Sequence, residues 1–438
     1  MPLRLVLLIY NLCLPFVLLV LLPASVLKMR KRGGYGSKFW QRFGIFRPLE
    51  KQRLAEAAGR CLWVHAVSVG EVNVARKLID QLLRLRPDMP IVLSVTTSTG
   101  YAVASDKAPA SLTVIYSPVD LPPVVRSVFR RIRPVQFILV EAEVWPNLVR
   151  TAQKSGVPVR LVNARLSPRS ERRYRKFRAL AAPVFGMLDA VMVQEPEDAA
   201  RWTDIGAPPE RVRVTGSVKY DQSGTGSASP ARMEEFREIL RACWNGQLPR
   251  VVLAASTHPG EEQALGGVWR GMMAEFPDVR LLIAPRHAER RAEVRAALEA
   301  TGLRTALRSL PFPQTETPPD VLIVDSTGEL RHWQALSQIV IIGKSLLATG
   351  GQNPAEAIAA GVPVLTGPHM ENFTPLMRLL TDARGLRQVE SLEQVADALR
   401  DLLQNSREAE AMAARGKAAL DRHAGAAART AALLMDFK

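Results

Sequence analysis

The chain has 438 residues, more than one ordinary hydrophobic core accommodates, so its length predicts at least two domains. Apolar residues make up 47% and charged residues 23%, a balance typical of globular proteins that excludes a disordered chain. The net charge of +16 predicts an anionic partner, such as nucleic acid, an anionic membrane face or a phosphorylated substrate. The three cysteines, Cys13, Cys61 and Cys243, show no disulfide or zinc-ligand spacing, which favours a reducing compartment.

The N-terminal segment is apolar and is followed by a basic cluster. Residues 3–27 are almost wholly apolar, a stretch long enough to span a bilayer or to lie within one leaflet. The basic cluster at residues 28–32 follows this stretch, whereas only Arg4 stands at its start, and this asymmetry predicts that the rest of the chain is cytoplasmic. A cleaved signal peptide, the alternative, carries its charge before the apolar run. The sequence therefore favours a membrane anchor, either spanning or bent at Pro15 and Pro23.

Beyond the anchor, strand-like and helical segments alternate. In the first half we expect strands at residues 61–67, 90–95, 112–116, 135–140, 158–163 and 189–194. A composition rich in Ser, Gly and Pro around 222–231 indicates a linker, after which strands are expected at 251–255, 279–284, 321–324, 339–342 and 363–365. Residues 391–436 are expected to be helical. This alternation predicts an α/β fold of two Rossmann-like halves with parallel sheets, and a cleft between them.

Glu71 has a position typical of ligand-binding residues. It follows the expected strand at 61–67 through a turn that contains Ser68 and Gly70, and it lies in the first turn of an amphipathic helix. Ligands of open α/β sheets bind at the carboxyl ends of the strands, so we expect Glu71 in a binding site. The alternative is a structural role, because a carboxylate there also offsets the positive end of the helix.

Two further carboxylates, Glu141 and Glu143, directly follow the expected strand at 135–140. Two carboxylates in such a place are costly to bury unless they are paired or hydrogen-bonded. The alternative is that one of them caps the next helix, which explains one carboxylate more easily than both. The hydroxyl-rich turn at 96–100 can likewise cap a helix or donate to a phosphate or a sugar.

The second half carries side chains that suit a nucleotide. Ser256 and Thr257 follow a strand and precede a helix, where free backbone N–H groups form an anion site. Arg286, at the end of the next strand, can bridge a phosphate with two hydrogen bonds. The glycine-rich turn at 350–353 leads into a helix whose first turn contains Glu356, a carboxylate able to accept hydrogen bonds from two ribose hydroxyls.

Several common motifs are missing from the sequence. The segment Gly343-Lys344-Ser345 is not a P-loop, because the first glycine of that motif would fall at Gln338. No G-x-G-x-x-G follows the first strand, which disfavours a dinucleotide oxidoreductase, and the six histidines show no metal-binding spacing. We therefore predict no metal site and no cofactor.

As a set, these loops resemble those of the Kdo transferases, membrane-bound glycosyltransferases that attach 3-deoxy-D-manno-oct-2-ulosonic acid (Kdo) to the lipid A precursor. The resemblance covers nearly the whole chain in order and spacing. It is carried by the motifs HAVSVGEV (65–72), EAEVWPNL (141–148), NARLSPRS (163–170), TGSVKYD (215–221), STHPGEE (256–262), APRH (284–287), DSTGEL (325–330) and GGQNPAEA (350–357).

The resemblance implies a GT-B fold, CMP-Kdo as donor, and inversion at the anomeric carbon without a bound metal. It implies a membrane anchor at 1–32, an acceptor domain at 33–220, a linker at 221–249 and a nucleotide-sugar domain at 250–438, whose final helices are free to cross back to the first domain. The enzyme would work on the cytoplasmic face of the inner membrane, in lipopolysaccharide biosynthesis.

Carried over residue by residue, the resemblance makes Glu71 the general base and puts Glu141 or Glu143 and Lys219 near the donor sugar and its carboxylate. A base at position 71 needs a pKa raised by partial burial to work near neutral pH. Ser256, Thr257 and Arg286 would hold the phosphate and Glu356 the ribose. The full set implied to bind the nucleotide is Ser256, Thr257, Arg286, His287, Gly328, Glu329, Gly350, Gly351, Asn353 and Glu356.

Three departures from the family pattern stand out. Lys344 occupies the place of a glycine, Gln352 that of a histidine and Ala142 that of a threonine. They leave a GT-B transferase with another nucleotide sugar as an alternative. A membrane-tethered nucleotide-binding protein without activity is a second alternative, against which Glu71, Arg286 and Glu356 speak. Nucleic-acid binding, which the charge of +16 invites, has no recognition motif in its favour.

Overall fold

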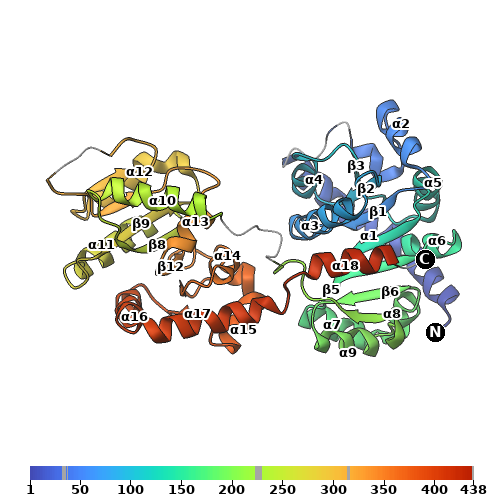
Figure 1. Ribbon diagram of the computed structural model, residues 1–438. Coiled ribbons are helices and arrows are strands. Elements are labelled where there is room, and N and C mark those ends of the chain that lie inside the picture. Colours follow the sequence, from blue (N-terminus) through green and yellow to red (C-terminus); the bar gives the residue numbers. More distant parts are fainter. Residues whose placement is uncertain (32–35, 37, 222–228, 313–315, 437–438) are drawn as a thin grey trace. The chain divides into compact units, whose positions relative to one another are not determined.

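The computed structural model describes residues 1–31, 36, 38–221, 229–312 and 316–436, and the chain divides into two compact units (Figure 1). The first unit consists of Met1–Asp221 and Gly425–Lys438, and the second of Gln222–Ala424. Of the features expected from the sequence, the linker residues 222–228 and, near the N-terminus, Arg32 and Tyr35 lie outside the described residues.

The described part of the first unit is built on a parallel sheet of seven strands in the order β3-β2-β1-β4-β5-β6-β7. The strands are β1 (Leu62–Ala66), β2 (Ile91–Val95), β3 (Leu112–Tyr116), β4 (Gln136–Val140), β5 (Val159–Ala164), β6 (Ala190–Val193) and β7 (Val212–Val214). The helices are α1 (Leu3–Lys31), α2 (Pro48–Ala57), α3 (Val69–Leu85), α4 (Ser98–Ser105), α5 (Pro122–Ile132), α6 (Pro146–Lys154), α7 (Pro168–Lys176), α8 (Arg178–Phe185), α9 (Pro196–Asp204) and α18 (Ala426–Asp436), with 3-10 turns η1 (Phe39–Phe43) and η2 (Pro209–Arg211).

Both faces of this sheet are covered, as the continuous apolar runs of its central strands require. On β1, Leu62 and Val64 pack in one buried cluster with residues of α3 and α18. Trp63 faces the other way and packs against Phe129 and Phe137, with ring centroids 4.7 Å away in both cases. Because successive side chains of a strand point to opposite faces of the sheet, this strand contributes to a hydrophobic layer on each face.

The last helix of the chain, α18, returns to the first unit and packs against α3 (Figure 1). The carboxylate of Asp221 accepts hydrogen bonds from the backbone N–H groups of Gly425 (3.0 Å) and Ala427 (2.8 Å) at the start of α18. At the other end, Gln136 and Arg160 donate to the carbonyl oxygen of Leu434. The helix is therefore fixed at both ends by buried polar groups of the first unit.

The second unit repeats the architecture, with a parallel sheet of seven described strands in the order β10-β11-β9-β8-β12-β13-β14. The strands are β8 (Arg250–Thr257), β9 (Val279–Pro285), β10 (Thr305–Leu307), β11 (Val321–Ile323), β12 (Ile339–Ile342), β13 (Val364–Thr366) and β14 (Arg387–Gln388). The helices are α10 (Pro230–Cys243), α11 (Glu261–Met272), α12 (Arg291–Glu299), α13 (Leu330–Leu336), α14 (Ala355–Ala359), α15 (Thr374–Asp382), α16 (Glu393–Gln404) and α17 (Ser406–Asp421), with 3-10 turns η3 (Ala288–Arg290) and η4 (Glu371–Phe373).

The expected strands all form, and the two parallel sheets confirm the predicted α/β class. Three short edge strands, β7, β10 and β14, were not predicted. The prediction of a linker over 221–249 is wrong for residues 230–243, which form α10. This helix buries Phe236 and Leu240, and Phe236 stacks on His332 of α13 with 4.7 Å between the ring centroids, so it is part of the second unit.

The N-terminal helix α1 packs one face against the rest of the first unit and leaves the other face exposed. Val6 and Leu14 are buried, while large apolar side chains on the rest of the helix are open to solvent, among them Leu12 at 61% and Phe16 at 71%. Residues Leu3–Val20 have a mean hydropathy of 2.3, which makes this helix long and apolar enough to cross a membrane. Within this apolar stretch of α1, the Tyr10 hydroxyl donates to Asp120 over 3.0 Å.

Candidate functional site

The strand order of the first unit reverses between β1 and β4, and the predicted acidic residues follow these two strands. In parallel α/β sheets, the loops on the carboxyl side of such a reversal are the preferred binding place, because they diverge to opposite faces of the sheet. Glu71 lies after β1, in the first turn of α3, and Glu141 and Glu143 lie between β4 and α6. The prediction that these loops hold the acidic residues is therefore matched by their positions.

Glu71 is buried, and both of its carboxylate oxygens accept hydrogen bonds. The backbone N–H of Val67 donates to one oxygen (2.7 Å) and the hydroxyl of Ser68 to the other (2.8 Å). Burial raises the pKa of Glu71 to about 7, and the nearby carboxylates of Glu143 and Glu141 add to the increase, against the two hydrogen bonds. A carboxyl group that titrates near neutral pH is suited to accept a proton from a substrate hydroxyl.

Glu141 and Glu143 are partly buried neighbours of Glu71. Burial raises the pKa of both carboxyl groups, and the Trp145 indole, which donates to Glu143 over 3.1 Å, opposes the increase there. The alternative that one of them caps α6 is wrong. The N–H groups of Asn147 and Leu148, at the start of α6, donate instead to Asp120, over 3.0 and 2.8 Å.

Two cations lie beside this acidic cluster. The positive charges of Arg165, after β5, and of Lys219 both lower the pKa of Glu141 against the effect of burial. Lys219 has an exposed side chain, as a residue that contacts a substrate requires, and its carbonyl oxygen accepts a hydrogen bond from Lys77 over 3.2 Å. Next to it, burial raises the pKa of Tyr220 to about 12. The site of the first unit thus has a buried acidic side and a cationic side.

In the second unit the strand order reverses between β8 and β12, and Glu261 joins the loops that follow these strands. The Glu261 carboxylate, which is fully buried, accepts hydrogen bonds from the N–H groups of His258 (3.0 Å), Lys344 (2.6 Å) and Leu346 (3.1 Å). The two loops touch at Gly343, where a β-carbon would lie 2.3 Å from the Ser256 carbonyl oxygen. Only glycine permits this approach.

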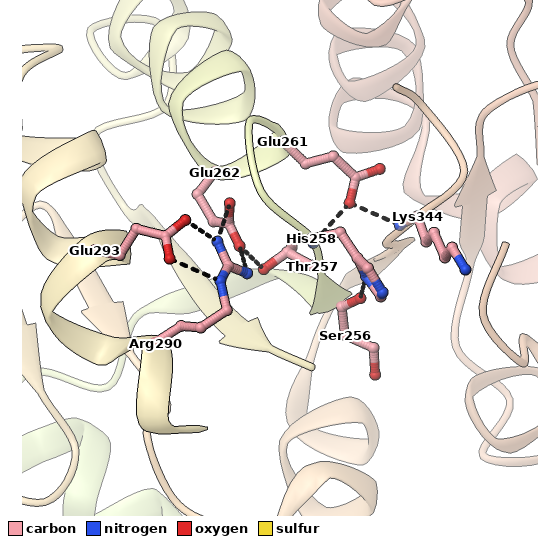
Figure 2. A network of polar contacts seen from close by, with 8 residues as sticks. All are labelled: Ser256, Thr257, His258, Glu261, Glu262, Arg290, Glu293 and Lys344. Atoms are coloured by element: carbon pink, nitrogen blue, oxygen red, sulfur yellow. Dashed lines mark hydrogen bonds and ion pairs between the residues drawn. The ribbon is translucent and has the colours of Figure 1, made fainter. Parts of the chain in front are cut away.

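Thr257 is part of a buried network and does not present a free hydroxyl. Its hydroxyl donates to Glu262 over 2.9 Å, and Glu262 also accepts from Arg290 over 2.9 Å. Figure 2 shows Arg290 between Glu262 and Glu293, with its guanidinium bonded to both. Thr257 therefore fixes the loop after β8. Ser256, whose hydroxyl points away from this network in Figure 2, is only 9% exposed.

The loops after β9 and β11 hold four more of the predicted residues. Arg286 and His287 have exposed side chains, and the Arg286 N–H donates to the Thr257 carbonyl oxygen over 3.0 Å, so these residues lie beside the β8 loop. Gly328 has a positive φ of 80° in the turn before α13. The carboxylate of Glu329 accepts hydrogen bonds from the Ser326 hydroxyl (2.5 Å) and from Arg308 (3.3 Å), and these bonds occupy both of its oxygens.

The glycine turn after β12 leads into α14, as expected from the sequence. Gly350 and Gly351 have φ angles of 111° and 65°, and the side chain of Asn353 caps the turn by accepting the N–H of Ala355 over 3.1 Å. Glu356 lies in the first turn of α14 with its side chain exposed. The Gly351 N–H donates to the Lys344 carbonyl oxygen over 3.1 Å, which ties this turn to the β12 loop.

Backbone strain is present at both candidate sites, which hold four of the eight non-glycine residues with positive φ in the described part of the chain. Four non-glycine residues with positive φ lie at the carboxyl ends of the strands that flank the reversals or directly beside them: Glu141 (61°), Asn163 (53°), Ser256 (59°) and Lys344 (56°). Such conformations cost about 1–3 kcal/mol each and persist where the surroundings impose them, which is most frequent at functional sites. Strain at these loops therefore supports their assignment as sites.

The sequence did not single out Arg165, Asp120, Glu261 and Arg290. Arg165 stands in the NARLSPRS motif, and Glu261 in STHPGEE, so membership in a motif was the available signal. Several of their partners are distant in the chain, such as Tyr10 for Asp120 at 110 positions and Leu346 for Glu261 at 85 positions, and no local pattern indicates these contacts. Among the residues that the structure describes, no group of three or more His, Cys, Asp or Glu side chains is placed to hold a metal ion.

Comparisons with known proteins agree with this architecture. Residues 37–222 match the family described as 3-deoxy-D-manno-octulosonic-acid transferase (kdotransferase), and residues 348–435 match a glycosyl transferase-like family. A solved structure of UDP-GlcNAc 2-epimerase from Neisseria meningitidis, bound to UDP-GlcNAc, has the same fold, with a TM-score of 0.54 and 13% sequence identity. The similarity covers 86% of this chain and 98% of that one, and it supports the GT-B type of fold.

Two curated relatives match over most of their length. The 3-deoxy-D-manno-octulosonic acid transferase of Haemophilus influenzae is 32% identical over 376 residues, 82% of this chain and 85% of the relative. The enzyme of the same name from Bordetella pertussis is 34% identical over 386 residues, 86% of this chain and 87% of the relative. The chain belongs to the 3-deoxy-D-manno-octulosonic acid transferase family and is a glycosyltransferase.

Proposed function

We propose that this protein transfers Kdo from CMP-Kdo to the lipid A precursor in lipopolysaccharide biosynthesis, with inversion at the anomeric carbon and without a metal ion. Membership in the family supports the reaction. The observation that carries the mechanism is Glu71, a buried carboxylate with a pKa raised to about 7 at the point where the sheet of the first unit reverses. At that pKa a substantial fraction of the group is ionised and able to act as a base at neutral pH.

In the proposed mechanism, the Glu71 carboxylate takes the proton of an acceptor hydroxyl while the hydroxyl oxygen attacks the anomeric carbon of Kdo. The bond between that carbon and the phosphate oxygen breaks, and CMP leaves with the bonding electron pair. Attack from the side opposite to the leaving group inverts the anomeric centre. The hydrogen bonds from Val67 and Ser68 orient the carboxylate for this step.

The charged groups near Glu71 suit the donor sugar, which carries a carboxylate. Lys219, with its exposed side chain, is proposed to pair with that carboxylate, and Arg165 to offset the charge of Glu141. Burial is the main cause of the raised pKa of Glu71, and the carboxylates of Glu143 and Glu141 add to it. Both are proposed to lie near the sugar and to bind its hydroxyls.

The loops of the second unit are proposed to hold CMP. The exposed Arg286 would bind the phosphate together with Ser256, and Glu356 the ribose hydroxyls. His287, Gly328 and the 350–353 turn complete the nucleotide site, while Thr257 and Glu329 shape their loops through the bonds described above. Neutralising the departing phosphate with fixed cations and N–H groups stabilises the transition state.

The helix α1 is proposed to attach the enzyme to the cytoplasmic face of the inner membrane. Its exposed apolar side chains suit the acyl region, and the basic residues that follow in the sequence suit anionic headgroups. Because Tyr10, within the apolar stretch of α1, is bonded to Asp120 of the first unit, a helix lying along the membrane surface fits these contacts better than one crossing the bilayer. The enzyme would then reach the lipid acceptor while that lipid stays in the membrane.

The test is the reaction itself. The purified full-length protein is mixed with the lipid A precursor in mixed micelles, together with CMP-Kdo or, separately, with UDP-GlcNAc, and the lipid product is identified by mass spectrometry. We expect a product heavier by one or more Kdo residues in the reaction with CMP-Kdo, and no product in the reaction with UDP-GlcNAc. A product formed only from UDP-GlcNAc, or from neither donor, would contradict the proposed function.

A further inference from the structure

Lys344 has a backbone conformation that a lysine rarely adopts. It follows β12 in the loop next to the reversal of the second sheet, and its φ of 56° lies in the left-handed region. Glycine adopts this conformation without strain, and lysine does not. A strained, charged residue in a candidate nucleotide site suggests that its side chain has a use there.

The backbone of Lys344 is fixed from both sides. Its N–H donates to the buried Glu261 carboxylate over 2.6 Å, and its carbonyl oxygen accepts the Gly351 N–H over 3.1 Å. These bonds connect Lys344 to the loop after β8 and to the glycine turn before α14. The side chain therefore leaves the backbone in a defined direction, between two loops that are proposed to bind CMP.

The ammonium group of Lys344 lies next to the glycine turn. A β-carbon added at Gly350 would lie 3.7 Å from its Nζ atom. Figure 2 shows the side chain extending away from the Glu261 carboxylate, to which only the backbone of Lys344 is bonded. The positive charge is thus presented at the glycine turn and not to the buried acid beside it.

Two acids of the neighbouring loops have partners other than the Lys344 ammonium group. Glu261 accepts three backbone N–H groups, and Glu371 accepts the Gly350 N–H over 2.6 Å and faces His369. Lys344 forms no ion pair with any residue in the described part of the chain. An ammonium group that is half-buried and unpaired is poised to bind an anion.

We propose that the Lys344 ammonium binds the phosphate of the CMP leaving group and so strengthens nucleotide binding at this site. This inference rests on the proposed function and adds to it a residue that determines affinity for the phosphate. The charge would also assist the departure of CMP, because it offsets the negative charge that develops on the phosphate oxygen. It would equally slow the release of CMP after the reaction.

The test compares CMP with cytidine, which lacks the phosphate, by isothermal titration calorimetry on the full-length protein in detergent. The variant is Lys344→Gly, which removes the charge and suits the φ angle. The matched control is Arg384→Gly, which removes another exposed cation at a positive φ (49°) in the same unit. A second variant, Lys344→Gln, keeps the β-carbon and removes only the charge.

We expect both Lys344 variants to bind CMP about tenfold or more weakly than the wild type, the loss typical of one charge-assisted hydrogen bond. Cytidine binding and the Arg384→Gly variant should be unchanged, and raising the salt concentration should weaken CMP binding more in the wild type than in the Lys344 variants. Equal CMP affinity in the wild type and the Lys344 variants would overturn the inference and leave the proposed function intact. This is also the result expected if Lys344 contacts the carboxylate of the donor sugar and not the phosphate of CMP. A wild type that does not bind CMP would overturn both.

Discussion

The hydroxyl of Ser68 donates a hydrogen bond to the Glu71 carboxylate over 2.8 Å, while the N–H of Glu71 points back to the same hydroxyl over 3.4 Å. This exchange resembles a capping box, in which residues three apart satisfy the free groups at the start of a helix. Glu71 is therefore both a structural cap of α3 and the proposed base. The two roles have different consequences for stability and for activity.

Replacing Glu71 by Gln should stabilise the protein at alkaline pH. Because the folded-state pKa of about 7 lies above the ordinary value of 4.5, the folded state binds the proton more tightly, and ionisation of Glu71 lowers stability as the pH rises from 4.5 through 7. Gln does not ionise; its amide oxygen can accept the Val67 N–H, and its NH2 group can donate to the Ser68 hydroxyl, which reverses the direction of that hydrogen bond. We expect the free energy of unfolding of Glu71→Gln, measured by chemical denaturation, to exceed that of the wild type by about 3 kcal/mol at pH 8 and to equal it near pH 4.5. A difference that does not change with pH would refute the raised pKa.

The acidic neighbours of Glu71 should set the pH dependence of activity. The Glu143 carboxylate raises the pKa of Glu71, so Glu143→Gln should lower that pKa and move the acid limb of the kcat/KM profile to lower pH. The control is Glu56→Gln, on the exposed surface of α2. If the limb stays in place in Glu143→Gln, or moves equally in the control, the electrostatic coupling is not present.

Glu261 should be needed for the shape of the nucleotide loops. Gln at this position turns an N–H donor toward one of the three backbone N–H groups that the carboxylate now accepts. The loss of a buried hydrogen bond predicts a destabilisation of about 1–3 kcal/mol and weaker CMP binding. Thermal unfolding and calorimetry with CMP would measure both effects, with the exposed Glu289→Gln as control. Unchanged CMP affinity in Glu261→Gln would remove this residue from the site.

Asp120 should hold α1 against the rest of the first unit. It is buried, which raises its pKa to about 7, and it accepts hydrogen bonds from Tyr10 of α1 and from the N–H groups that begin α6. Tyr10→Phe removes one of these bonds and should cost about 1 kcal/mol, whereas Asp120→Asn leaves a buried N–H group facing a donor and should cost more. Denaturation in detergent would rank them against the exposed Asp106→Asn. An equal effect of all three variants would contradict the account.

The sequence allowed the central strands of both sheets to be predicted, because buried parallel strands are continuous apolar runs. The edge strands β7, β10 and β14 have only two or three residues each, with charged or polar side chains among them, and therefore lack the apolar run that marks a central strand. Helix α10 was missed because the Ser- and Gly-rich segment before it dominates the local composition, although Phe236 and Leu240 have helical spacing.

Within the candidate site, the predictable residues are those at or shortly after the carboxyl end of a strand, such as Glu71, Glu141 and Ser256. Their position in the sequence, next to a predicted strand, is enough to place them at the carboxyl ends of the strands. The long-range contacts of the second-unit loops were not predictable, since Glu261 reaches Lys344 across 83 positions. The hydrogen bonds of Glu71, Thr257 and Glu329 to partners three to five positions away are within reach of a local pattern, whereas the positive φ of Lys344 is not.

The most direct test of the central claim is the rate of Kdo transfer by Glu71→Gln, compared with its affinity for CMP. We predict a loss of transfer of about 10²–10⁴-fold at pH 8, the range for removal of a general base, with CMP binding within twofold of the wild type. Transfer at the wild-type rate by a folded Glu71→Gln protein would contradict the assignment of Glu71 as the base.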